Sequence, residues 1–296
     1  MVIPKLCDRS TLAPTRISDK PDMSARQDPL PQLPLTEQEL SDYRRDGFLI
    51  RPGIFTADEV AAFQRAAETA SARAHEACSE GRTYHLDGKR FVDVGHMTVQ
   101  YEHSPDSELI RVIEPVHELA SAFDQLIDDA RLVEPMRQLV GADSLALWTD
   151  KLNLKRPREG SAFGWHQDSP YWVHDCDHVD QLPNVMVTFD DADETNGCFR
   201  VIRGSHQQGC LPGTADGSQL GGFYTDPGVF DEADQVPMVA PAGSAIFFDP
   251  HTIHGSEANG SDDARRAIVI TYQPSGFPAL KSGAVRNVSA GLRAAH

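Results

Sequence analysis

The second half of the chain places the strongest constraint on the fold. After Gly141 the sequence breaks into short β-rich runs that are separated by clusters of Gly, Pro, Asn and Asp. The expected strands are 145–155, 184–189, 198–202, 244–248 and 266–272. Short strands at such spacing are typical of sandwiches and jelly rolls. We therefore predict a mainly β fold with flanking helices and a jelly-roll, cupin-like core.

The first half of the chain carries helix signals instead. A threonine followed three residues later by a glutamate satisfies free backbone N–H groups at a helix start, and Thr36 with Glu39 and Thr56 with Glu59 match this pattern. The expected helical regions are 37–46, 57–79 and 107–140, the last interrupted at Pro115 and Pro135. Residues 47–50 are predicted as a short strand between the first two helices.

These patterns also divide the chain into parts. The first 35 residues are rich in Pro, Asp, Ser and Arg and lack periodicity, which predicts a flexible tail over 1–35. A single catalytic domain is expected over 36–296, because β-rich enzymes of this length often form one unit. Within it, 36–140 is predicted to be largely helical support and 141–280 to be the β core.

Composition excludes several classes of partner. The formal net charge is −17, so nucleic acid and anionic membrane surfaces would be repelled. No run reaches the roughly 18 apolar residues of a membrane span, and residues 1–10 lack the apolar stretch of a signal peptide. The five cysteines form no CxxC pair, so neither a disulfide framework nor a thiolate zinc site is indicated. We expect a cytoplasmic protein that acts on a small molecule; the oligomeric state is not predicted.

Three His-x-Asp motifs are candidates for two metal ligands, because residues i and i+2 of a strand project from one face. The motif at 85–87 runs into Gly88, as a turn would, and the motif at 178–180 lies in a polar, acidic stretch. Both patterns indicate solvated surface. His166 and Asp168 differ because bulky neighbours can enclose a metal, namely Trp165, Pro170, Tyr171 and Trp172.

A third ligand is expected downstream, where an apolar strand ends in a loop that carries His251 and His254. Either histidine fits at this point. Two neutral imidazoles and one carboxylate form the facial triad of non-haem iron(II) oxygenases, which leaves positions for a bidentate 2-oxo acid and dioxygen. A 2-oxo diacid also needs a cation for its far carboxylate, and arginine suits this role. Arg265 and Arg266 open the next strand, and only one of them can point inward.

Taken together, these residues resemble the phytanoyl-CoA dioxygenase family of iron(II)- and 2-oxoglutarate-dependent oxygenases, which are built on a double-stranded β-helix. The matching segments are Asp46-Gly47-Phe48, Lys155, His166-Gln167-Asp168, Asn196-Gly197-Cys198, Arg203-Gly204-Ser205-His206, His254-Gly255-Ser256 and Arg265. The Asn-Gly-Cys and Gly-Ser-His segments are expected to be structural, because their glycines permit tight turns.

The resemblance implies a ligand set and three cofactors. In this family the distal ligand is the histidine directly before Gly-Ser, which implies iron(II) bound by His166, Asp168 and His254. The arginine eleven residues later, Arg265, is implied to bind the distal carboxylate of 2-oxoglutarate. Further implied contacts of 2-oxoglutarate are Lys155, Ser256 and Asn153. Dioxygen completes the set.

The implied reaction is hydroxylation of a small molecule, such as a natural product, an amino acid or a lipid-like compound, with release of succinate and CO2. Asp168 disfavours halogenation, because related halogenases replace this carboxylate. Desaturation, epoxidation, ring formation and peroxide formation stay open. Met186 stands where family members that act on fatty acyl-CoA often have tryptophan, which argues against such a substrate. Candidate substrate contacts in the loops 82–103, 169–184 and 209–236 are His96, Tyr171, Trp172, Phe223 and Tyr224.

Two other functions compete with this interpretation. One is a cupin-like metalloenzyme that uses the same three ligands without 2-oxoglutarate. The other is a metal-free jelly-roll module that binds a ligand or a protein. Arg265 distinguishes a 2-oxoglutarate-dependent enzyme from the first alternative, and the three metal ligands distinguish it from the second.

Overall fold

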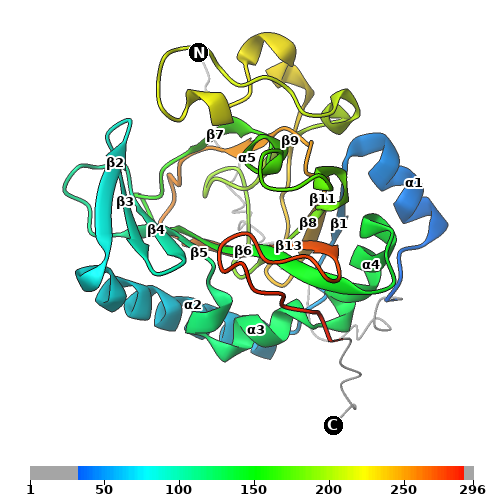
Figure 1. Ribbon diagram of the computed structural model, residues 1–296, viewed down its shortest axis with the longest axis horizontal. Coiled ribbons are helices and arrows are strands. Elements are labelled where there is room, and N and C mark those ends of the chain that lie inside the picture. The colour runs from blue at the N-terminus through cyan, green and yellow to red at the C-terminus, as the bar shows by residue number, and fades with distance from the viewer. Residues whose placement is uncertain (1–32, 290–296) are drawn as a thin grey trace, which may run out of the picture. The chain divides into compact units, whose positions relative to one another are not determined.

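Two antiparallel β-sheets form the centre of the computed structural model, which describes residues 33–289 (Figure 1). The strands are β1 (Phe48–Arg51), β2 (Arg82–Leu86), β3 (Lys89–Val94), β4 (Met97–Tyr101), β5 (Ile110–Glu114), β6 (Leu145–Lys155), β7 (Phe163–His166), β8 (Asn184–Thr188), β9 (Arg200–Ile202), β10 (Gln235–Pro237), β11 (Ala245–Phe248), β12 (His254–Ser256) and β13 (Arg265–Pro274). The larger sheet has the order β1-β11-β8-β13-β6-β5-β4-β3-β2, and the smaller one has the order β10-β9-β12-β7. The predicted tail lies almost entirely outside the described residues.

The helices are α1 (Glu37–Asp46), α2 (Ala57–Ala77), α3 (Ser121–Ile127), α4 (Ala130–Val140) and α5 (Ser169–Trp172). Both predicted capping boxes are present, at Thr36 with Glu39 and at Thr56 with Glu59. Helices α2 and α3 run along the outside of the larger sheet, on the side away from β7 and β9 (Figure 1). No helix in the described part of the chain has the length and apolar character needed to cross a membrane.

The core has two layers. On the helical side, Phe63 of α2 and Phe123 of α3 both pack against Phe189, with ring centroids 5.4 and 5.7 Å away. Between the two sheets, Phe199 and Phe248 pack with centroids 4.9 Å apart. Apolar side chains therefore fill both faces of the larger sheet, as expected for a sheet covered by helices on one side and by a second sheet on the other. The prediction of a mainly β fold with a jelly-roll core is confirmed.

The first half of the domain is less helical than predicted. Segment 36–140 supplies five strands of the larger sheet in addition to α1–α4, and the predicted helical region 107–140 begins with β5. The run at 110–114 is rich in β-branched residues, and its pairing with β4 and β6 decides its conformation. Pro135 does not end the helix that contains it. It lies inside α4, because a helix can continue past a proline with the loss of one backbone hydrogen bond.

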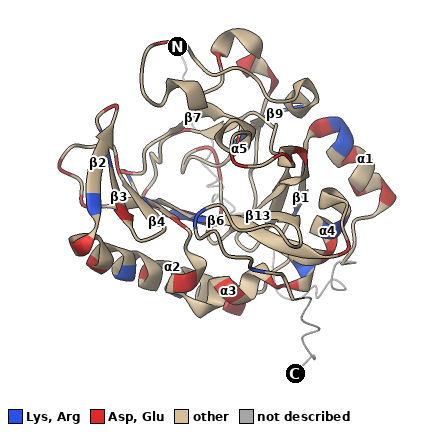
Figure 2. Cartoon of the chain, in the orientation of Figure 1, with Lys and Arg blue, Asp and Glu red and all other residues tan. Residues whose placement is uncertain are grey.

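Charged residues are spread over α1, α2 and α3 (Figure 2), and ion pairs on an exposed surface contribute little to stability. Arg51 of β1 is an exception because it is only 6% exposed. Its guanidinium donates to both carboxylate oxygens of Glu39, at 2.8 and 2.9 Å, and to the backbone carbonyls of Leu33 and Pro34. This arginine ties α1 and the chain before it to the edge of the larger sheet.

The pair of Arg51 and Glu39 gives a pH-dependent contribution to stability. The hydrogen bonds from Arg51 lower the pKa of Glu39 from 4.5 to about 2, so the contribution is present above pH 4.5 and is lost as the pH falls toward 2. We expect Glu39→Gln to lower the free energy of unfolding by about 2 kcal/mol at pH 6. Urea denaturation followed by circular dichroism should show this difference shrinking between pH 5 and pH 3, and a difference that stays constant would contradict the role of the ion pair.

Candidate active site

Three predicted metal ligands converge between the two sheets. His166 is the last residue of β7, Asp168 follows it at the start of α5, and His254 is the first residue of β12. Strands β7 and β12 pair so that His254 lies directly opposite His166, with the ring centroids 4.1 Å apart. One ligand atom from each of the three residues lies within 4.8 Å of the others. This spacing fits coordination of a single ion.

The two histidines are held in the tautomer that a metal requires. The Nδ1 atom of His166 lies 2.8 Å from the carbonyl oxygen of Gly164, and that of His254 lies 2.9 Å from the carbonyl oxygen of Thr252. A carbonyl only accepts, so each Nδ1 carries the hydrogen and each Nε2 keeps a free lone pair. Burial lowers the pKa of His166 to about 3 and also lowers the pKa of His254, so both rings are neutral near pH 7.

Asp168 is fixed by polar neighbours. Burial, the largest influence, raises the pKa of its carboxyl group, but Lys151 and the two histidines outweigh it and the net pKa is lowered. The amide of Asn184 donates to Asp168 Oδ2 at 2.9 Å, and the hydroxyl of Thr271 donates to Asn184 Oδ1 at 2.5 Å. Lys151 Nζ lies 3.6 Å from Asp168 Oδ1. The carboxylate is therefore ionised and oriented, as a metal ligand must be.

His251, the other histidine of the loop, has a different role. Its Nδ1 lies 2.8 Å from the hydroxyl of Ser169, and its Nε2 lies 2.8 Å from a carboxylate oxygen of Asp180. In the same loop, the carbonyl of Pro250 accepts the backbone N–H groups of Asp168 and Ser169, at 3.1 and 3.0 Å. The Nδ1 contact braces the turn that carries Asp168, and the Nε2 contact joins the loop to Asp180. Both ring nitrogens of His251 are therefore engaged, which supports His254 as the third ligand.

The other two His-x-Asp motifs have structural contacts. The carboxylate of Asp87, in the turn between β2 and β3, accepts the backbone N–H groups of Gln219 and Leu220. His178 contacts Gln273, and Asp180 is the partner of His251. Within residues 33–289, the cluster of His166, Asp168 and His254 is the one group of at least three such side chains that meets metal-ligand spacing.

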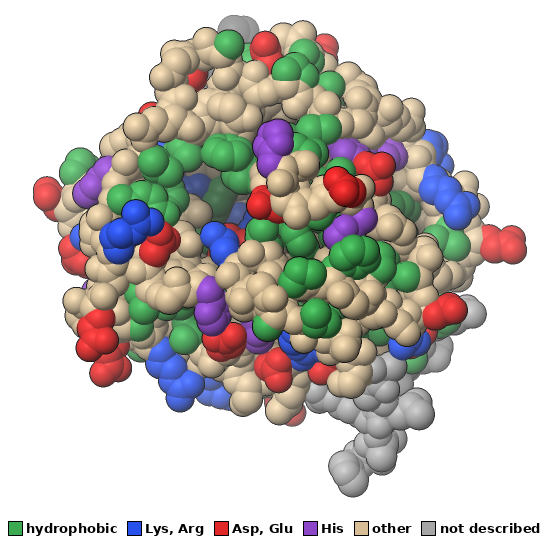
Figure 3. Space-filling view, viewed as in Figure 1, with side chains coloured by type: hydrophobic (Ala, Val, Ile, Leu, Met, Phe, Trp, Pro, Cys, Tyr) green, Lys and Arg blue, Asp and Glu red, His purple; other side chains and the backbone are tan. Residues whose placement is uncertain are grey.

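A cavity of about 250 Å³ adjoins the three ligands. The space-filling view shows the molecule hollowed on this face, with apolar and basic side chains inside the hollow (Figure 3). Tyr171 and Phe223 stack at its wall, with ring centroids 4.4 Å apart. The predicted residues that line the cavity are Asn153, Tyr171, Phe223, Tyr224, Ser256 and Arg265.

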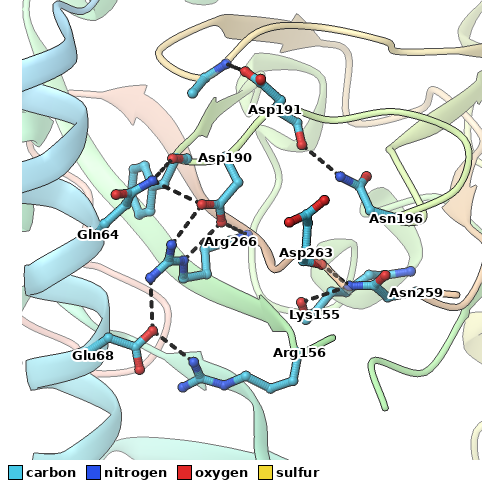
Figure 4. A network of polar contacts seen from close by, with 12 residues as sticks. Gln64, Glu68, Lys155, Arg156, Asp190, Asp191, Asn196, Asn259, Asp263 and Arg266 are labelled. Carbon is cyan, nitrogen blue, oxygen red and sulfur yellow. Dashed lines mark hydrogen bonds and ion pairs between the residues drawn. The ribbon is translucent and has the colours of Figure 1, made fainter. Parts of the chain in front are cut away.

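The contacts of Arg265 and Arg266 separate their roles. Arg266 points out of the cavity, where its guanidinium donates to Asp190 at 2.9 and 2.7 Å and to Glu68 at 3.0 Å (Figure 4). Arg265 lines the cavity, is 2% exposed, and its Nε finds no hydrogen-bond partner among the described residues. Burial lowers the pKa of Arg265 to about 10, so it stays charged near pH 7. A buried cation without a partner fits an anionic ligand.

Three predicted site residues lie elsewhere. His96 is at the turn between β3 and β4, is exposed, has its Nε2 3.1 Å from Glu118, and does not line the cavity. Lys155 is buried, but its Nζ donates to the carbonyl of Glu257 and it does not line the cavity. Its pKa is lowered to about 6 by burial and by the nearby Arg265 and another arginine. Trp172 packs against Trp148, with centroids 6.3 Å apart, and does not line this cavity.

The sequence analysis did not predict several polar residues that line the cavity, among them Lys89, Arg111, Glu114 and Lys151. Arg111 is 5% exposed, its Nη1 has no partner in the described part of the chain, and its guanidinium lies 3.6 Å from the centroid of the Phe163 ring. It was missed because β5 was predicted as helix. Lys151 had a usable signal, since it shares a strand face with Asn153.

Comparisons with known proteins identify the family of the chain. The family model described as phytanoyl-CoA dioxygenase (PhyH) matches residues 43–267. Ectoine dioxygenase of Bordetella bronchiseptica is 30% identical over 261 residues, which cover 80% of this chain and 75% of that protein. L-proline trans-4-hydroxylase of Streptomyces griseoviridis is 28% identical over 183 residues, 56% of this chain and 68% of that protein. The crystal structure of EctD from S. alaskensis with bound Fe matches at 26% identity with a TM-score of 0.62, covering 91% of each chain. The resemblance seen in the sequence is confirmed, and the chain belongs to the phytanoyl-CoA dioxygenase (PhyH) family.

Proposed function

We propose that this chain, an iron(II)- and 2-oxoglutarate-dependent dioxygenase, hydroxylates a small molecule in the cavity beside His166, Asp168 and His254. The observation that carries the proposal is the shared cavity: the three metal ligands and the unpaired cation of Arg265 face the same space. Iron(II) with 2-oxoglutarate and dioxygen supplies the oxidising chemistry, with succinate and CO2 as co-products. Residues 36–296 would form the single catalytic domain.

The protein's part in this reaction is to bind and orient. The Nε2 atoms of His166 and His254 and the carboxylate of Asp168 would hold the metal on one face, which leaves the cavity side open to ligands. Arg265 would hold the distal carboxylate of 2-oxoglutarate, and Ser256 and Asn153 line the same cavity. Arg111, buried and with a free Nη1, adds positive charge near Arg265 and Lys155.

The loop that contains Phe223 and Tyr224 forms part of the cavity wall. Lys89 donates to the phenol oxygen of Tyr224 at 2.7 Å, and Asp87 accepts two backbone N–H groups from the same loop. Both contacts come from the hairpin of β2 and β3. A loop held in this position shields part of the site from water, which protects reactive species and strengthens the electrostatic interactions inside the site.

The size of the site supports a small substrate. A cavity of about 250 Å³ suits a small ligand, and the names of two relatives, ectoine dioxygenase and L-proline trans-4-hydroxylase, denote enzymes of small polar molecules. The unpaired Arg265 favours use of 2-oxoglutarate over a cupin-like reaction without it. The oriented triad favours an enzyme over a metal-free binding module.

Replacing Arg265 should separate this proposal from the cupin-like alternative. We expect Arg265→Met to weaken 2-oxoglutarate binding about 10- to 100-fold, because a charge-assisted contact to the distal carboxylate is lost. Arg266→Met is the matched control: it breaks the contacts with Asp190 and Glu68, so it should lower stability and leave 2-oxoglutarate affinity unchanged. Anaerobic titration of the iron-loaded protein, followed by the visible charge-transfer band, measures both. Equal affinities in the wild type and Arg265→Met would overturn the assignment.

Asn184 offers a test of the metal site that does not depend on turnover. We expect Asn184→Ala to weaken iron(II) or manganese(II) binding about 10- to 100-fold, because outer hydrogen bonds orient metal ligands. Isothermal titration calorimetry measures the affinity. Asn196→Ala is the control, since the amide of Asn196 donates to the carbonyl of Asp191 and not to a metal ligand. The orienting role of Asn184 is excluded by an unchanged affinity in a folded Asn184→Ala protein.

A further inference from the structure

A second cavity, of about 330 Å³, lies next to the first. Glu114, Lys151 and Tyr171 line both cavities, so these side chains form the boundary between them. The remaining walls come from α5 and the segment after it and from the chain that follows β13, and their residues are Trp172, Asp175, Leu280 and Lys281. Tyr171 is 37% exposed, so this boundary is reached from solvent.

Opposite charges face this second cavity without pairing to each other. Lys281 Nζ donates to the hydroxyl of Thr98 at 3.3 Å, and no carboxylate lies within ion-pair distance of it among residues 33–289. Glu114 accepts from the hydroxyl of Thr149 at 2.7 Å and likewise has no ion-pair partner in the described chain. Asp175 adds a second carboxylate to the same lining, so Lys281, Glu114 and Asp175 bring one ammonium group and two carboxylates into this small space.

The boundary adds a second cation and aromatic surface. Lys151 Nζ lies 5.4 Å from the ring centroid of Trp172 and 5.9 Å from that of Tyr171. It also lies 3.6 Å from Asp168 Oδ1, so the boundary is next to the proposed metal ligands. The aromatic walls suit the carbon skeleton of a small ligand.

The loss of water from the charged side chains of the second cavity decides which ligands it can bind. A neutral or apolar molecule would cover Lys281 and Glu114 and remove part of their water without replacing it, which is unfavourable for charged groups. A molecule with a single charge would satisfy one of them and leave the other unpaired. A zwitterion compensates both.

We infer that the second cavity is the outer part of the substrate site and selects a zwitterionic small molecule, such as an amino acid, with its carboxylate at Lys281 and its cationic group at Glu114. This inference rests on the proposed function and names the substrate class of that site. The aromatic boundary then lets the carbon skeleton extend toward His166, Asp168 and His254.

The test uses the full chain loaded anaerobically with iron(II) and 2-oxoglutarate. Appearance of the charge-transfer band checks the proposed function first, so its absence counts against that proposal and not against the selectivity of the cavity. The loaded protein is then titrated with the twenty common amino acids and with the carboxamide and N-acetyl derivative of each, followed by tryptophan fluorescence and by the band. We expect at least one amino acid to bind about tenfold more tightly than both of its derivatives.

Substitutions at Lys281 and Glu114 test which side chain binds which charged group of the ligand. Lys281→Met should weaken binding of the amino acid about tenfold and leave binding of its carboxamide unchanged, while Lys281→Arg should retain the wild-type affinity. Glu114→Gln should weaken binding of the amino acid and leave that of its N-acetyl derivative unchanged. Ser282→Ala, next to Lys281 and outside the cavity lining, is the local control. The inference is overturned if no amino acid binds, if the derivatives bind as tightly, or if Lys281→Met weakens all three forms equally.

Discussion

The antiparallel pairing of β7 with β12 is the contact on which the active site depends. It places His254 opposite His166, although the two residues are far apart in sequence. The carbonyl of Pro250 then accepts backbone N–H groups from Asp168 and Ser169, which locks the turn after β7 to the loop before β12. Because these contacts are between backbone groups, the relative positions of the ligands are set by the sheet and do not rely on a bound ion.

The unpaired charges distinguish functional from structural residues. Arg266 lies next to Arg265 in sequence, and His251 lies shortly before His254. The guanidinium of Arg266 and both ring nitrogens of His251 have hydrogen-bond partners within the fold. Arg265 is buried beside the cavity with part of its guanidinium unpartnered in the described chain. Burial of an unpaired cation costs free energy, so its presence in a folded domain indicates a ligand that compensates it. In the outer cavity, Lys281 and Glu114 are half-buried, and neither has an ion-pair partner in the described part of the chain.

The sequence predicted the three residues that converge at metal-ligand spacing, His166, Asp168 and His254, because the family motifs that contain them are local. The histidine before Gly-Ser and the spacing to Arg265 are short-range patterns, and both capping boxes depend on residues three apart. Cavity residues from β5, such as Arg111, were not predicted, because 110–114 becomes a strand through pairing with distant segments. Lys281 could not be foreseen either, since it reaches the cavity through the path of the chain after β13.

The central claim is that His254, and not His251, completes the iron site with His166 and Asp168. The most direct measurement compares iron(II) binding and the 2-oxoglutarate charge-transfer band in the His254→Ala and His251→Ala proteins. The structure predicts loss of both signals in His254→Ala. In His251→Ala the band should persist, with weaker iron binding at most, because that histidine only braces the turn at Ser169. An intact band in His254→Ala, or its complete loss in a folded His251→Ala protein alone, would contradict the account.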